Sequence, residues 1–255
     1  MNSAISSTIG QKKPRQAEKS AESLSRGTEF LMHTMRDNHW CFELEADVTI
    51  PSEYIFLQRI LKRNNLVLDE KIGAYLRRRQ NVNGSWALYE DGPGDMSATV
   101  KAYFALKLMG HSIDDIHMVS ARKWVLQNGG AETVNVFTRI TLALFGQLSW
   151  KTVPAMPVEM MFLPKWWFFH LSKVSYWSRC VIVPLLVIFA KRPVYETPLE
   201  QSISELFMQS PSSLTTLDKI NWRQPVCAGF VILDRGLKFV NNLIPRFMRE
   251  RALVK

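Results

Sequence analysis

The stretch Lys71–Trp86 reads K-I-G-A-Y-L-R-R-R-Q-N-V-N-G-S-W and contains the spacing Q-x-x-x-G-x-W. Gly84 supplies a turn at which a positive φ costs little. The side-chain amide of Gln80 can bind backbone groups that are left unpaired at the end of a neighbouring helix. Trp86 offers a flat aromatic surface on which that amide can stack. The run therefore predicts a helix end that is clamped to its neighbour, a structural role rather than a ligand site.

A unit of roughly 45 residues recurs along the chain, a period typical of helical repeats. Trp40 precedes Trp86 by 46 positions. In this earlier copy Thr34 takes the glutamine position and Asn38 takes the glycine position. Asparagine is the non-glycine residue that best tolerates a left-handed turn, so the first copy is degenerate but keeps its turn. The preceding turns correspond as well, at Phe30-Leu31, Tyr75-Leu76 and Trp124-Val125.

The third copy, Gln127–Gly130, keeps the turn residues without the tryptophan. Two apolar helical stretches end at Gly110 and Gly146, where a glycine favours helix termination. The β-branched runs 181–183 and 231–232 lie in longer stretches that are better described as helix. The predicted fold class is therefore all-α, an α/α barrel (toroid) of stacked helix-pair repeats tied by the Q-G-W motifs.

Composition limits the classes of partner and cofactor. The chain has 255 residues, a net charge of +9 and a sequence pI of about 9.6. This charge favours an anionic membrane over nucleic acid, because no nucleic-acid-binding signature is present. Three widely spaced cysteines and five histidines without a paired spacing predict no metal site, and a reducing compartment. No phosphate-cradling glycine loop is present, so no cofactor is expected.

The N-terminal segment is polar and lacks the apolar stretch of a secretory signal. We expect residues 1–21 to form a disordered leader and residues 22–255 to form the domain. The most apolar run, Cys180–Ala190, is bounded by Arg179 and Lys191 and is shorter than the ~20 residues that a spanning helix needs. A membrane-spanning segment is therefore not predicted.

The second half of the chain departs from the repeat pattern. Residues 154–193 are rich in proline and aromatic residues, and residues 193–223 are polar and serine-rich, which predicts an exposed loop. Residues 224–248 form an amphipathic helical pattern with Arg235, Lys238 and Asn241 on its polar side. Its apolar face contains Phe230, Leu233, Leu237, Val240 and Ile244.

The Lys71–Trp86 run, with its continuation through Gly110, resembles the QW repeat of triterpene cyclases, specifically squalene–hopene cyclases. Further matching segments follow in the family's order, and the resemblance covers roughly residues 20–255. In that family the QW residues tie outer helices together, and the implied reaction is a proton-initiated carbocation cyclisation of squalene to hopene-type triterpenes. The matching segments are 121–130, 136–144, 157–164 and 174–193.

The same resemblance implies a substrate cavity and a membrane contact. Trp177 matches an aromatic residue of the family's cavity wall, where an indole face can stabilise a cation, although a tryptophan in an apolar helix is equally typical of core packing. Val174 and Ile182 would narrow the hydrophobic entrance, although core packing explains both residues equally well. The cyclases are monotopic, so the apolar face of residues 224–248 is expected to contact the membrane surface from the cytoplasmic side.

The catalytic acid of the family is missing from this chain. These enzymes protonate an alkene with a D-x-D-D motif, and no D-x-D-D occurs in the 255 residues. Asp91, Asp95, Asp114 and Asp115 are typical of turns and helix starts, and Glu159 adds no motif, so no catalytic residue is assigned. We therefore expect an N-terminal half, cut within a helix near residues 245–255, that needs a C-terminal half carrying D-x-D-D.

Two alternatives stay open, and so does the question of whether this chain is itself an enzyme. One is a non-catalytic helical-repeat protein that binds a membrane or a partner. The other is a related terpenoid cyclase or prenyltransferase-like barrel, which the QW copies and the lack of a D-D-x-x-D motif disfavour.

Overall fold

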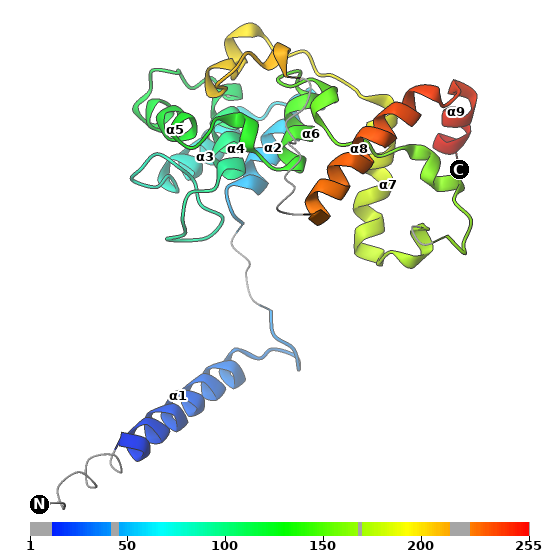
Figure 1. The fold of residues 1–255 in the computed structure, drawn as a ribbon. Helices are drawn as coiled ribbons and strands as arrows, with labels where there is room; N and C mark the ends of the chain where they lie inside the picture. Colours follow the sequence, from blue (N-terminus) through cyan, green and yellow to red (C-terminus); the bar gives the residue numbers. More distant parts are fainter. Residues whose placement is uncertain (1–11, 42–45, 168–169, 215–224, 255) are drawn as a thin grey trace, which may run out of the picture. The chain divides into compact units, whose positions relative to one another are not determined.

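The computed structural model describes residues 12–41, 46–167, 170–214 and 225–254 (Figure 1). Two compact units divide the chain, residues 1–45 and residues 46–255, and each is described by itself. The described residues contain helices and short 3₁₀ turns but no strand, which confirms the all-α prediction.

The first unit consists mainly of helix α1, Lys12–Thr34. The helix includes residues 12–21 of the predicted disordered leader; residues 1–11 lie outside the described part of the chain. After α1 the backbone turns at Asn38, whose φ is +62°. The Trp40 indole N–H donates to the Leu31 carbonyl at 2.6 Å and holds the turn against the helix.

Helix α4, Met96–Leu108, is the centre of the second unit. It packs against α2 (Thr49–Ile60), α3 (Leu66–Arg78) and α5 (Ile116–Gln127), and every residue from Ser97 to Leu108 is buried. The Asp95 carboxylate begins the helix by accepting from the Ala98 N–H at 2.8 Å. A helix that is apolar on nearly all sides is stable only when neighbours surround it.

Two lysines of this buried helix have acidic partners. Lys101 forms an ion pair with Glu53 of α2, and Lys107 forms one with Glu205. Charges are removed from water at high cost unless an opposite charge and hydrogen bonds compensate them. These pairs therefore tie α4 to α2 and to the segment around Glu205.

The aromatic part of the core joins elements that are distant in sequence. Phe56, Phe104 and Phe145 contact one another with ring centroids 5.2–5.5 Å apart. Tyr195 adds an edge-on contact to Phe145 at 5.3 Å. Phe145 follows helix α6, Val136–Leu144, so these rings link α2, α4 and α6.

The predicted glycine helix ends are confirmed. Gly110 follows α4 with φ +96°, and Gly146 follows α6 with φ +67°. In the third repeat copy Gly129 and Gly130 also have positive φ, +100° and +74°. These values lie where a Cβ atom would be strained, which explains the glycines at these positions.

Residues 193–214 are only in part the exposed loop that their polar composition predicts. They form the short 3₁₀ turns Leu199–Gln201, Ser204–Leu206 and Pro211–Ser213. The sequence of this segment has no regular apolar period, so its buried residues could not be predicted. Four of its apolar side chains belong to the main core: Ile203, Leu206, Phe207 and Leu214. Residues 215–223 of the predicted loop lie outside the described residues.

The remaining elements lie together at the other end of the second unit (Figure 1). They include η3 (Val158–Phe162), α7 (Tyr176–Lys191), α8 (Pro225–Leu243) and α9 (Arg246–Val254). The helix that the sequence predicts over residues 224–248 ends at Leu243 in the structure. Pro245 separates α8 from α9, because proline lacks an N–H group and disfavours helical backbone at the residue before it.

Candidate functional site

The Gln80 side chain joins the end of α3 to the start of α5. Its amide Nε2 donates to the Gly84 carbonyl at 2.9 Å and to the His117 carbonyl at 2.8 Å. His117 lies in the first turn of α5. One side chain thus binds its own turn and a neighbouring helix, an arrangement that favours a structural tie.

Trp86 is completely buried and binds two further elements. Its indole N–H donates to the Leu76 carbonyl at 2.7 Å, and its backbone N–H donates to the Thr99 hydroxyl of α4 at 3.0 Å. The corresponding bond in the first repeat copy runs from Trp40 to Leu31. Both copies therefore use an indole-to-carbonyl hydrogen bond, and the acceptor precedes the tryptophan by nine residues in the first copy and by ten in the second.

Gly84 lies where no side chain fits. Its φ is +89°, and a Cβ atom would lie 2.5 Å from the backbone carbon and oxygen of Ser120. The turn after α3 therefore approaches the backbone of α5 directly, and Gln80, Gly84 and Trp86 converge on one junction between α3, α4 and α5.

Helix α7 carries Trp177 and Ile182 of the cavity residues expected from the family resemblance, and Val174 lies two residues before the helix. Its first residues are held by Ser175, whose hydroxyl accepts from the Ser178 N–H at 3.2 Å. Trp177 is 82% exposed, whereas Val174 and Ile182 are half-buried. Ile182 packs with Leu186 beside η3 and α9. Within the described residues Trp177 therefore lies on the surface, separate from the packing of Ile182.

Helix α8 docks onto the unit through its polar side. Asp234 accepts from the Ala155 N–H at 2.5 Å and forms an ion pair with Lys238 at 2.8 Å. Lys238 also donates to the Lys151 carbonyl at 3.0 Å, and Asn241 accepts from Arg249 at 2.8 Å. Asp234, Lys238 and Asn241 thus face inward together with the buried Ala228, while Arg235 is exposed.

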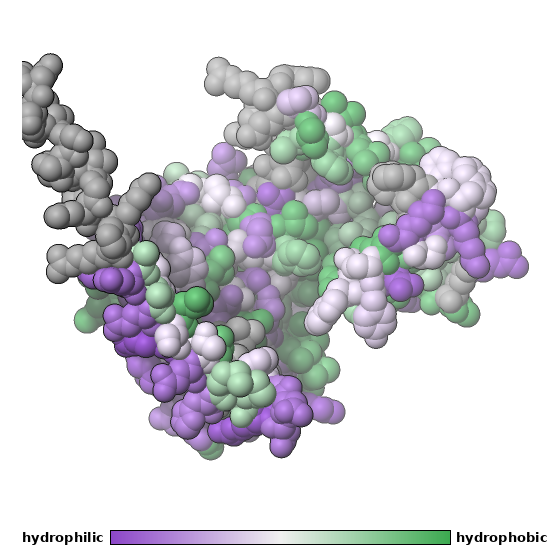
Figure 2. All heavy atoms as spheres, turned by 90° about the horizontal axis from the view of Figure 1, so that it is seen from below, coloured by the Kyte–Doolittle hydropathy of each residue, from purple (hydrophilic) through white to green (hydrophobic). Residues whose placement is uncertain are grey.

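The apolar face of α8 consequently reaches the surface. Phe230 is 67% exposed, Leu233 51% and Val240 49%, while Leu237 and Ile244 are half-buried. Figure 2, a view from below, shows green hydrophobic residues among white and purple ones on the face that it draws. Among the described helices, none is both long and apolar enough to cross a membrane.

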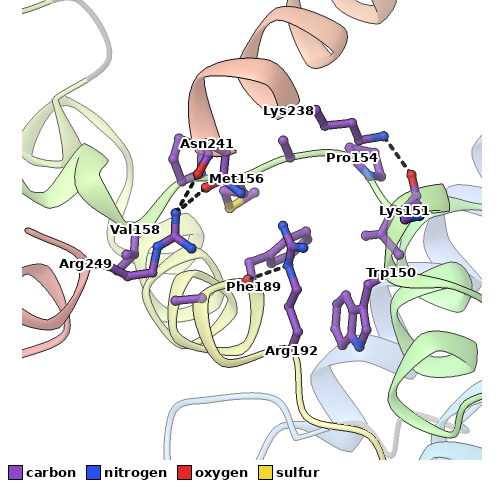
Figure 3. A pocket seen from close by; sticks show the side chains of 14 residues that line it. Trp150, Lys151, Pro154, Met156, Val158, Phe189, Arg192, Lys238, Asn241 and Arg249 are labelled. Atoms are coloured by element: carbon purple, nitrogen blue, oxygen red, sulfur yellow. Dashed lines mark hydrogen bonds between the residues drawn. The ribbon is translucent and has the colours of Figure 1, made fainter. Parts of the chain in front are cut away.

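A cavity of about 340 Å³ lies where α7, α8 and α9 meet residues 150–158 (Figure 3). Trp150, Met156 and Phe189 supply apolar walls, and the Trp150 and Phe189 rings meet edge-on at 6.1 Å. Four basic residues also line the cavity: Lys151, Arg192, Lys238 and Arg249.

The acids singled out in the sequence have structural positions. Asp95 and Asp115 precede helices α4 and α5, and Asp91 lies in a turn with φ +55°. The Glu159 carboxylate forms an ion pair with Arg249 at 3.1 Å. Asp114 lies on the exposed surface two residues before the start of α5. The turn and helix-start interpretation of the aspartates is therefore confirmed.

One group of donor atoms was not predicted from the sequence. His111, Asp115 and His117 bring one donor atom each within 4.8 Å of one another, which could hold a metal ion. Burial lowers the pKa of both imidazoles, and the Arg77 guanidinium lowers them further, while Asp115 opposes the change. The signal in the sequence was H-x-x-x-D-x-H, a spacing outside the paired-histidine patterns considered.

Cys41, Cys180 and Cys227 are free and exposed, so no disulfide joins the described cysteines.

Taken together, the packed helices, the Gln80–Gly84–Trp86 junction and its degenerate first copy at Trp40 define an all-α helical-repeat protein. Residues 24–255 match the family model described as the squalene-hopene cyclase N-terminal domain. The chain therefore belongs to the squalene–hopene cyclase family, whose N-terminal domain has the α/α toroid fold, and the predicted resemblance is confirmed.

The chain is similar to several named cyclases and to one synthase. The chain is 46% identical over 240 residues to a probable squalene–hopene cyclase of Sinorhizobium fredii, covering 91% of this chain and 36% of that protein. It is 48% identical over 221 residues to a squalene–hopene cyclase of Bradyrhizobium diazoefficiens, covering 85% and 33%. A dammaradiene synthase of Dryopteris crassirhizoma is 31% identical over 229 residues, with 87% and 32% covered. The chain thus spans about a third of the length of the curated relatives that it matches.

Proposed function

We propose that this chain supplies the N-terminal part of a squalene–hopene cyclase, contributing cavity wall and a membrane-bound substrate entrance for the polycyclisation of squalene. The family match over residues 24–255 is the observation that carries this proposal. The chain contains no D-x-D-D motif, so a second polypeptide segment must supply the acid that protonates the substrate. The chain alone is expected to be inactive.

The exposed side chains of α7 support a cavity role. Trp177 and the neighbouring Tyr176 are 82% and 73% exposed, although such large aromatic side chains are usually buried in a folded domain. A second segment that covered α7 would turn Trp177 into the wall of an enclosed, apolar space. There its indole face would stabilise a carbocation by about 2 kcal/mol without reacting with it.

The orientation of α8 supports membrane contact. A helix that exposes Phe230 and Leu233 while turning Asp234 inward departs from the usual pattern of a surface helix in water. Burying this face in the boundary of a lipid layer would remove its apolar area from water. A net charge of +9 favours anionic lipid, as at the cytoplasmic face of a membrane.

Squalene turnover tests the catalytic part of the proposal. Membranes from cells expressing this chain are assayed with and without a C-terminal cyclase half that carries D-x-D-D. Cyclised product is expected only when both polypeptides are present, and Trp177→Ala should then lower the rate. Trp166→Ala is the matched control, because Trp166 is also an exposed tryptophan, at 75%, but lies outside α7. Product from this chain alone would contradict the missing-acid argument.

A second candidate function is a non-catalytic helical-repeat protein that binds a membrane, which the exposed face of α8 favours. Vesicle flotation separates it from the cyclase proposal. The double change Phe230→Asp and Leu233→Asp should abolish flotation, whereas Leu66→Asp and Val67→Asp, at exposed positions on α3, should not. Flotation without cyclisation in the two-polypeptide assay would favour this second function.

A further inference from the structure

The cavity beside α8 has an excess of positive charge. Lys151, Arg192, Lys238 and Arg249 line it, and no aspartate or glutamate is among its lining residues. Asp234 and Glu159, which lie just outside the lining, pair with Lys238 and Arg249. With the two carboxylates included, the four basic side chains leave the cavity region with a net positive charge.

Lys238 and Arg249 are already engaged in holding the fold. Lys238 binds Asp234 and the Lys151 carbonyl, and Arg249 binds Glu159 together with the carbonyl and side-chain oxygen of Asn241. Their positions are thus fixed by hydrogen bonds, and their charges are partly compensated. They form a rigid, basic rim for the cavity.

Arg192 differs from these two residues. Its Nε donates to the Phe189 carbonyl at 3.4 Å, and its guanidinium has no carboxylate partner among the described residues. Figure 3 shows this side chain extending into the cavity between α8 and the Trp150 ring. Its terminal N–H groups therefore remain available to a ligand, and the Lys151 ammonium likewise has no ion pair in the described structure.

The shape and chemistry of the cavity suit a phosphate ester that carries an apolar part. A guanidinium binds phosphate oxygens through two parallel hydrogen bonds, a geometry that lysine cannot provide. The volume of about 340 Å³ is within the range of small-molecule sites. Trp150, Met156 and Phe189 offer an apolar wall next to the cations, as an amphiphile requires.

We propose that this cavity binds the phosphate group of an anionic amphiphile, with Arg192 as its principal ligand and Lys151 as the second. The phosphate comes either from a phospholipid head group or from a soluble phosphate ester. The lipid source rests on the proposed membrane contact of α8, whereas the soluble source does not.

Two binding measurements on the full chain test the proposal and separate the sources. Flotation with phosphatidylcholine vesicles, with and without phosphatidylglycerol, reports on the lipid. Titration calorimetry with glycerol 3-phosphate reports on the soluble ester. Arg192→Gln and Lys151→Gln are the test variants. Arg235→Gln is the matched control, because it removes the same charge from an exposed position on α8 outside the cavity.

Arg192→Gln is expected to weaken binding in at least one of these measurements by about tenfold or more, the size of a lost charge-assisted pair. Arg235→Gln should change only the general attraction to an anionic surface. A specific loss confined to phosphatidylglycerol vesicles identifies the head group, and one confined to glycerol 3-phosphate identifies a soluble ester. Failure to bind any vesicle would count against the membrane contact alone.

Two results would overturn the proposal. The first is an equal loss for Arg192→Gln and Arg235→Gln on anionic vesicles without measurable glycerol 3-phosphate binding. The second is unchanged binding in both measurements for Arg192→Gln and Lys151→Gln. Circular dichroism of each variant verifies that the helices are retained, so a loss of binding is not a loss of fold.

Discussion

Replacing Gly84 with alanine should be among the most damaging single-methyl changes in this protein. The new Cβ atom would lie 2.5 Å from the carbon and oxygen of the Ser120 backbone, and the backbone would keep a φ of +89°. The left-handed conformation costs a non-glycine residue about 1–2 kcal/mol. Overpacking against a helix backbone adds about 1–3 kcal/mol, because the α5 backbone cannot change rotamer as a side chain does.

Gly110 provides a control that separates these two contributions. It has a similar φ of +96°, yet a Cβ atom there would meet nothing within 4 Å. Gly110→Ala should therefore lose only the conformational part, about 1–2 kcal/mol. The difference between the two variants measures the steric cost of separating the α3 turn from α5.

Urea denaturation followed by circular dichroism gives the two free energies of unfolding. Thermal unfolding gives a second measure, since each kcal/mol lowers the Tm of a domain of this size by about 2–4 °C. Equal losses for the two alanine variants would refute the reasoning. They would mean that α5 moves away at no cost, and that the Gln80 and Trp86 hydrogen bonds do not fix the junction.

Two further predictions concern the stability of the folded chain. Trp86→Phe should lower the free energy of unfolding by about 2–4 kcal/mol, because a buried indole and its hydrogen bond are lost. Trp40→Phe should lower it by about 1 kcal/mol or less, because Trp40 is 45% exposed. Urea denaturation compares the two variants. The second prediction concerns the pH dependence of stability. The pKa values of His111 and His117 are lower in the folded state than in the unfolded state. Below about pH 6.5 the unfolded state therefore binds more protons than the folded state. The free energy of unfolding should therefore decrease as the pH is lowered from about 7 to 5, and this decrease should be smaller for His111→Gln. The same pH dependence in both proteins would contradict the role of these histidines.

The local features of the fold could be predicted from the sequence. The positive φ at Asn38, Gly84 and Gly110 and the helix starts at Asp95 and Asp115 depend on a few adjacent residues. The family resemblance rested on the same short-range patterns. These features are predictable because backbone strain and helix capping act within a few residues.

Other features of the candidate sites escaped sequence reasoning. The polar composition of residues 193–214 gave no indication that Leu206 is buried. Its neighbour Glu205 forms an ion pair with Lys107 of α4, a contact between residues distant in the sequence. The basic cavity around Arg192 joins segments from residue 150 to residue 249. No local pattern contains such contacts.

Helix α8 shows where the two sources of information divide. The sequence by itself determined that the helix has an apolar and a polar face, because side chains repeat every 3.6 residues. Only the tertiary structure decided that Asp234, Lys238 and Asn241 of the polar face turn inward while Phe230 and Leu233 are exposed. Asp234 and Lys238 there meet the Ala155 N–H and the Lys151 carbonyl, so the choice of buried face was set by backbone groups some 80 residues away in the chain, which need partners when buried.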